Sequence, residues 1–141
     1  MGSINMKSIQ DFSIGQSASL KKTFSFEEVK CFCDLTGDHN PLHCDEEFAK
    51  KTRFGRCIVH GTFYTAVIGT LMGTKLPGYG TILIAEEYKF MKPVFIDDTI
   101  TFHLEIVEIQ KEKQKIILNA ICYNQNNEIV LEGKTITKIV Y

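Results

Sequence analysis

Several features that mark membrane, secreted or nucleic-acid-binding proteins are missing from this sequence. No apolar run reaches the roughly 18 residues of a membrane-spanning helix, and the N-terminus lacks the basic start and apolar stretch of a secretory signal. The 16 basic and 17 acidic residues give a net charge of -1, which provides no overall attraction to nucleic acid or anionic lipid. We therefore expect a cytoplasmic protein that binds neither nucleic acid nor membranes.

The cysteines also lack the pattern of a disulfide scaffold. The chain has 5 cysteines, an odd number, and none of them forms a CxxC pair. Small secreted domains usually carry an even and regularly spaced set. Reduced thiols are therefore expected.

Length and composition favour one folded domain. A chain of 141 residues can bury one hydrophobic core but would leave two domains marginal. Its 44% hydrophobic and 23% charged residues are ordinary for a globular protein. We expect a single domain over residues 1–141, with residues 1–6 set aside as a cloning tag or a disordered segment.

Helix signals dominate the first half of the chain. Ser25 and Glu28 have capping-box spacing, so a helix is predicted from there to Gly37, with an apolar face formed by Val29, Phe32 and Leu35. Residues 38–43 are predicted to form a loop, because Pro41 cannot lie inside a continuing helix. A short helix is expected after that loop, with Asp45 as its N-cap.

The second half of the chain predicts a buried helix followed by strands. Residues 61–73 contain no charged side chain, which is the pattern of a helix buried on all sides. One strand is expected before Ser25, and four more are predicted at residues 80–92, 98–110, 114–124 and 128–140. This order favours an α+β domain in which a five-stranded antiparallel sheet wraps around a central buried helix.

Two sequence blocks point to a known family. Residues 32–43 read Phe-Cys-Asp-Leu-Thr-Gly-Asp-His-Asn-Pro-Leu-His, and residues 58–61 read Ile-Val-His-Gly. Together with Ala49, they resemble the signature of the MaoC-like (R)-specific enoyl-CoA hydratases, the hydratase 2 family. The resemblance extends over the chain beyond about residue 12. It implies a hot-dog fold and the reversible syn hydration of a trans-2-enoyl-CoA thioester.

The same resemblance assigns roles to individual residues. Asp38 and His43 are the implied catalytic pair, Gly61 the oxyanion donor through its backbone N–H, and Asn40 and His60 the loop support. A carboxylate and an imidazole suit a reaction that needs both a base and an acid. Gly61 would begin a helix, where unpaired N–H groups and the positive dipole end face a ligand. Which member of the pair is the base stays open.

Three further assignments rest on position and residue type. The acyl pocket is assigned by closeness in sequence to Leu42, Phe63, Tyr64 and Val67. A basic cluster is assigned to the coenzyme A phosphates: Lys50, Lys51, Arg53 and Arg56. A short acyl chain such as crotonyl is expected. No metal and no cofactor are expected beyond the coenzyme A thioester substrate, since Pro41 disrupts the helical spacing that would make His39 and His43 joint metal ligands.

Other functions share this fold or this chemistry. An acyl-CoA thioesterase commonly carries a carboxylate on or beside the central helix, and residues 61–73 have none. A non-catalytic acyl-binding domain would not need the intact Asp38 and His43. An (R)-3-hydroxyacyl-ACP dehydratase of fatty-acid synthesis would carry the same motif and stays open. An exposed sheet edge and the family resemblance both favour a homodimer or a higher homo-oligomer.

Overall fold

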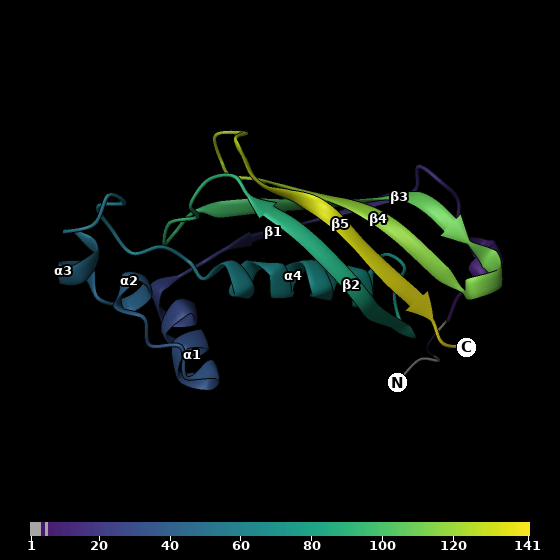
Figure 1. Ribbon diagram of the computed structural model, residues 1–141, viewed down its shortest axis with the longest axis horizontal. Coiled ribbons are helices and arrows are strands. Elements are labelled where there is room, and N and C mark those ends of the chain that lie inside the picture. The colour runs from purple at the N-terminus through teal and green to yellow at the C-terminus, as the bar shows by residue number, and fades with distance from the viewer. Residues whose placement is uncertain (1–3, 5) are drawn as a thin grey trace.

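A curved antiparallel sheet lies over one long helix, and three shorter helices extend beyond one end of the sheet (Figure 1). This computed structural model describes residue 4 and residues 6–141. Residues 1–3 and 5, part of the segment expected to be a tag or disordered, lie outside the described residues. The strands are β1 (Ser17–Thr23), β2 (Thr81–Phe90), β3 (Thr99–Gln110), β4 (Lys115–Tyr123) and β5 (Ile129–Ile139).

The helices complete the predicted α+β arrangement, which the structure confirms. They are α1 (Phe26–Thr36), α2 (Pro41–Cys44), α3 (Glu46–Ala49) and α4 (Gly61–Thr74), with short 3₁₀ turns at Ile9–Asp11 and Lys111–Lys113. No helix within the described part of the chain is long and apolar enough to cross a membrane.

The sheet has the strand order β1-β3-β4-β5-β2, with every neighbouring pair antiparallel. On β3, alternate side chains are buried toward α4: Ile100, Phe102, Leu104 and Ile106. The intervening side chains lie on the outer face, as the alternating sequence predicts. Strands β1 and β2 form the two edges of the sheet.

Helix α4 is buried along one side rather than all round. Its buried residues are Tyr64, Val67, Ile68, Leu71 and Met72. The opposite stripe of Thr62, Ala66, Thr70 and Thr74 is exposed in the single chain. The prediction of burial on all sides is therefore wrong for one chain, because the sheet covers only one side of the helix and the uncharged exposed residues are small.

Helix α1 begins and ends as the sequence predicts, but its apolar face differs. The Ser25 side chain accepts the Glu28 N–H at 3.2 Å, and Gly37 ends the helix in the left-handed conformation with φ 79°. The buried residues are Val29 and Cys33, whereas Leu35 is 86% exposed. The assignment of Leu35 to the buried face is wrong, because the i, i+4 spacing of Val29 and Cys33 follows the helical period more closely than i+6 does.

Pro41 opens a helix instead of lying in a loop. Residues 41–44 form one turn, α2, with Pro41 at its first position, where the missing N–H would have had no intrahelical partner. The loop prediction for residues 38–43 is therefore wrong for its second half. Residues 37–40 connect α1 to α2.

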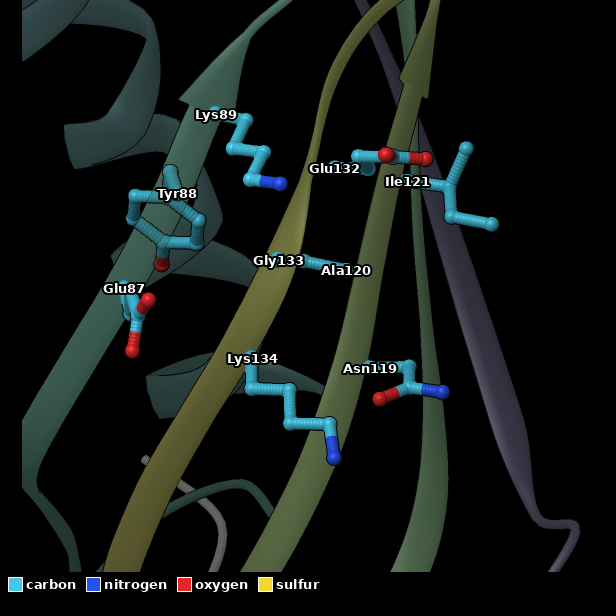
Figure 2. Close-up of a pocket in the computed structure, with 9 residues that line it drawn as sticks. All are labelled: Glu87, Tyr88, Lys89, Asn119, Ala120, Ile121, Glu132, Gly133 and Lys134. Carbon is cyan, nitrogen blue, oxygen red and sulfur yellow. The ribbon is translucent and has the colours of Figure 1, made fainter.

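The outer face of the sheet carries a shallow groove of about 480 Å³ (Figure 2). Opposite charges face each other across β2 and β5, where Glu87 is paired in register with Lys134 and Lys89 with Glu132. The resulting surface has no patch of a single sign, which fits a solvated sheet face. It lies on the opposite side of the sheet from α4.

Burial predicts contrasting effects for two leucines on helices. Leu71→Ala should lower the free energy of unfolding by roughly 2–5 kcal/mol, because Leu71 is fully buried between α4 and the sheet. Leu35→Ala should change it by less than about 0.5 kcal/mol, since Leu35 is exposed. Urea unfolding followed by circular dichroism measures both, and equal losses would contradict this packing.

Candidate active site

The residues of the two sequence blocks meet beyond the end of the sheet, where α1, α2 and the start of α4 come together (Figure 1). Gly37 turns the chain out of α1, and its N–H donates to the Cys33 carbonyl at 2.9 Å. Asn40 caps α2, since its side-chain oxygen accepts the Leu42 N–H at 3.2 Å. Asp38 lies on the four-residue connection, residues 37–40, between these two helices.

One oxygen of the Asp38 carboxylate accepts a hydrogen bond, and the side chain is partly exposed to solvent. Its Oδ1 accepts the Asn40 N–H at 3.3 Å, and its Oδ2 lies 3.9 Å from His60 Nε2. The side chain is 46% exposed. Asn40 thus contacts Asp38 through its backbone N–H and the start of α2 through its side chain, and its role as loop support stays a prediction.

His43 is buried with one ring nitrogen committed to the backbone. Its Nδ1 lies 2.8 Å from the Ile58 carbonyl oxygen. A carbonyl can only accept, so Nδ1 carries the hydrogen. The neutral ring therefore keeps a lone pair on Nε2, which is the state that a general base needs.

Asp38, His43 and His60 converge on one point. Their side-chain oxygen and nitrogen atoms lie within 4.8 Å of one another. The rings of His43 and His60 stack at 3.7 Å between centroids with an interplanar angle of 25°. Burial, followed by the nearby His43, lowers the pKa of His60, although the backbone and the charge of Asp38 partly offset this, so the neutral form of the ring is favoured.

These three side chains are also of the types that bind zinc. A shared zinc ion would need donor atoms that converge at about 2.0–2.2 Å. Rings stacked at an interplanar angle of 25° direct their lone pairs nearly parallel rather than toward one point. The arrangement suits proton transfer better than metal binding, and the absence of a metal stays a prediction.

A cavity of about 430 Å³ connects His43 to the beginning of α4. Gly61 is the first residue of that helix and lines the cavity. A Cβ at Gly61 would lie 2.7 Å from Cε1 of Phe90, so the phenyl ring occupies the space that a side chain would need. The first N–H groups of a helix have no intrahelical acceptor. The N–H of Gly61 is one of these groups, and it belongs to a residue of the cavity wall.

The cavity lining only partly matches the residues expected for the acyl pocket. Of the four, Tyr64 lines the cavity. Phe63 instead stacks on Phe32 at 4.8 Å, Val67 is buried in the core, and the Leu42 carbonyl accepts the Ile58 N–H at 3.2 Å. Sequence reasoning did not assign the other apolar lining residues, of which those at 90–94 come from a distant segment: Phe54, Ile58, Val59, Phe90, Met91, Pro93 and Val94.

The basic cluster is divided by the fold. Arg53 lines the cavity, together with Lys92, which the sequence did not single out. The Arg56 guanidinium lies 4.0 Å from the centre of the Phe95 ring, and Lys50 pairs with Glu47 at 3.2 Å on the surface. Lys51 is exposed and does not line the cavity.

Three buried thiols stay protonated around neutral pH. Burial, together with neighbouring Cys44, raises the pKa of Cys33 to about 11. Burial likewise raises the pKa of Cys57 and of Cys122 to about 12. The Cys33 sulfur lies 3.5 Å from His60 Nε2, so it contacts the site as a neutral group.

Comparisons with known proteins cover most of the chain. A family model described as "MaoC like domain" matches residues 11–127. The chain is 35% identical to the 3-hydroxybutyryl-CoA dehydratase of Methylorubrum extorquens over 92% of its length and 82% of the relative's. It is also 35% identical to the (R)-specific enoyl-CoA hydratase of Aeromonas caviae over 94% of its length and 98% of the relative's.

A solved structure agrees with these matches. It is described as an (R)-hydratase from A. caviae involved in PHA biosynthesis, and it has 34% sequence identity to this chain. The superposition covers 93% of this chain and 99% of the other, with a TM-score of 0.89. Both sequence blocks, residues 32–43 and 58–61, lie within the matched family range.

Proposed function

The chain belongs to the MaoC-like domain family, and from this premise we propose that it is an (R)-specific enoyl-CoA hydratase, a hydro-lyase. It adds water reversibly to a trans-2-enoyl-CoA and yields an (R)-3-hydroxyacyl-CoA. The observation that carries this proposal is the closeness of the Asp38 carboxylate to a His43 ring whose Nδ1 is held by the Ile58 carbonyl and whose Nε2 has no hydrogen-bond partner among the described residues.

In the proposed reaction Asp38 and His43 hold one water between them. The water oxygen forms a bond to C3 of the enoyl group while one water proton passes to the Asp38–His43 pair. The pair returns a proton to C2 on the same face, so atoms balance and no electrons leave the substrate. The proposal therefore includes no redox cofactor and no metal, and the coenzyme A thioester is the substrate.

Gly61 is the proposed donor to the thioester carbonyl. Negative charge develops on that oxygen as the C3–O bond forms, and the start of α4 offers an N–H group and the positive end of the helix dipole. One such donor is typically worth about 10²–10³ in rate. The absent side chain leaves room for the Phe90 ring, which packs against the backbone at this end of α4.

The cavity supports a coenzyme A substrate with a short acyl chain. Arg53 brings positive charge to the cavity wall, and we assign it to the phosphates, whereas the Lys92 ammonium is already paired with the Glu128 carboxylate. The relative from M. extorquens is named for a four-carbon acyl group, which favours crotonyl-CoA as the first substrate to test. The absence of Asp and Glu from α4 continues to argue against a thioesterase.

We also propose a homodimer joined through the free edge of β2. This edge strand pairs with β5 on one side, and within the described residues nothing pairs with its other side. Its apolar side chains Ile82, Leu83 and Ile84 are exposed in the single chain. A long apolar edge exposed to water promotes strand pairing, and a second copy would cover it.

The catalytic pair is tested by hydration of crotonyl-CoA. Asp38→Asn and His43→Ala should each lower kcat by at least about 100-fold, because each removes one member of the acid–base pair. The loss of conjugated-thioester absorbance measures the rate, and chiral analysis of the product should give the (R) alcohol.

Asp34→Asn is the matched control for a carboxylate outside the pair, because its side chain is 64% exposed on α1. It should keep wild-type activity. Full activity of Asp38→Asn would refute the catalytic assignment. Release of free coenzyme A would instead identify a thioesterase, and turnover confined to enoyl-ACP would identify the carrier-protein enzyme.

Gly61→Ala should lower kcat by roughly 10- to 100-fold, because the added methyl group meets Phe90 and obstructs the approach to the Gly61 N–H. Gly73→Ala is the control, since a Cβ there has no heavy atom within 4 Å and should leave kcat unchanged. Steady-state kinetics and thermal melting separate loss of catalysis from loss of stability. Wild-type kcat in Gly61→Ala would exclude this donor.

Leu83→Lys should convert the dimer to a monomer, because a charge on the β2 edge opposes strand pairing. Ile14→Lys, at an exposed position before β1, should leave the dimer intact. Light scattering coupled to size-exclusion chromatography measures the mass. A Leu83→Lys protein that remains dimeric would place the interface elsewhere.

A further inference from the structure

His60 has contacts that loop support alone does not require. It is 2% exposed, and it lies inside a column of aromatic rings from three helical segments. Phe63 stacks on Phe32 at 4.8 Å, Phe32 lies 4.7 Å from the His60 ring, and His60 stacks on His43 at 3.7 Å. The column therefore ends on the imidazole of the catalytic pair.

The two nitrogens of His60 have different surroundings. Nδ1 is buried and has no hydrogen-bond partner among the described residues. Nε2 lies 3.5 Å from the Cys33 sulfur and 3.9 Å from Asp38 Oδ2, and the Asp38 backbone also contacts the ring. A buried N–H without an acceptor is rarer in proteins than an acceptor without a donor. The favoured tautomer thus carries its hydrogen on Nε2, directed at Asp38, and leaves only a lone pair on Nδ1.

The charge of the surroundings agrees with a neutral ring. A second positive charge stacked 3.7 Å from His43 would repel any charge on that ring. The Cys33 thiol beside Nε2 stays protonated and neutral. The titratable groups that face this region are Asp34 and Cys33 from α1, Asp38 from the connection, and His43 and Cys44 from α2.

We propose that His60 is a positioning residue for Asp38: its neutral ring donates from Nε2 to Asp38 Oδ2 and holds the carboxylate beside His43. This role rests on the proposed hydratase function. The 3.9 Å separation is about 1 Å longer than a hydrogen bond. Asp38 is half-exposed on the four-residue connection between α1 and α2, so a small rotation closes the gap once substrate and water are bound. A neutral donor orients the carboxylate without neutralising it as a cation would.

Two variants distinguish hydrogen-bond donation by His60 from the packing of its ring. His60→Phe keeps a flat ring in the column but removes the donor, and His60→Gln removes the ring but keeps a neutral N–H donor. With crotonyl-CoA, His60→Phe should lose roughly 10- to 100-fold in kcat with KM within about threefold of wild type. His60→Gln should recover at least about tenfold of that loss.

The pH dependence of activity is a second test, because a purely packing role of His60 would not move it. Activity requires the Asp38 carboxylate, so it falls as pH decreases through the acid limb. A hydrogen bond to a carboxylate favours its charged form. Removal of the donor in His60→Phe should therefore move the acid limb to higher pH, whereas His60→Gln should keep it near the wild-type position. Equal losses in both variants with no movement of the acid limb would overturn the proposal.

Nitrogen NMR of histidine-labelled wild type tests the tautomer without any variant having to be active. The His60 signals are identified by their loss in His60→Gln, or by elimination among the 4 histidines if that variant does not fold. A hydrogen on Nε2 is expected, and a hydrogen on Nδ1 would overturn the proposal. A wild type that fails to hydrate enoyl-CoA would refute the proposed function, which this measurement does not depend on.

Discussion

The packing of α4 against the inner face of the sheet is the constraint on which the other features depend. Leu71 and Ile68 of the helix are buried against the alternating apolar residues of β3 and β4, so the helix axis is fixed along the sheet. Its first residue, Gly61, consequently lies at one end of the sheet, with His60 directly before it. The helices α1 and α2 are not covered by the sheet and gather around this end (Figure 1). The site is thus placed by a hydrophobic contact whose centre lies several helical turns away.

Aromatic contacts extend the core toward the reacting groups. Phe24 is fully buried and meets Phe63 edge to face at 5.0 Å, and Phe63 begins the column that ends on His43. Such contacts restrict ring orientation in a way that general apolar packing does not. The Ile58 carbonyl then holds His43 Nδ1, which leaves Nε2 as the nitrogen available for proton transfer. Orientation of the imidazole thus comes from both packing and one backbone hydrogen bond.

The electrostatic design of the site uses neutral groups around one carboxylate. Burial lowers the pKa of His60 and raises the pKa of Cys33, and both changes keep these side chains uncharged. The charged group, Asp38, is half-exposed and does not bear the full cost of desolvation. A carboxylate left beside a neutral imidazole can accept a proton from water and return one to substrate. Two buried cations next to it would instead suppress that basicity.

The sequence alone determined the order of strands and helices, the capping of α1 and the grouping of Asp38 with His43, because these depend on local spacing and on residue type. The fold class and the family expected from residues 32–43 are confirmed, while the individual site roles stay predictions. Only the tertiary structure decided that Leu35 faces solvent, that one side of α4 is exposed, and that Phe90 and Lys92 line the cavity. It also decided that His60 stacks on His43, since contacts between residues far apart in sequence depend on how the packed elements cross, and no local pattern encodes that crossing.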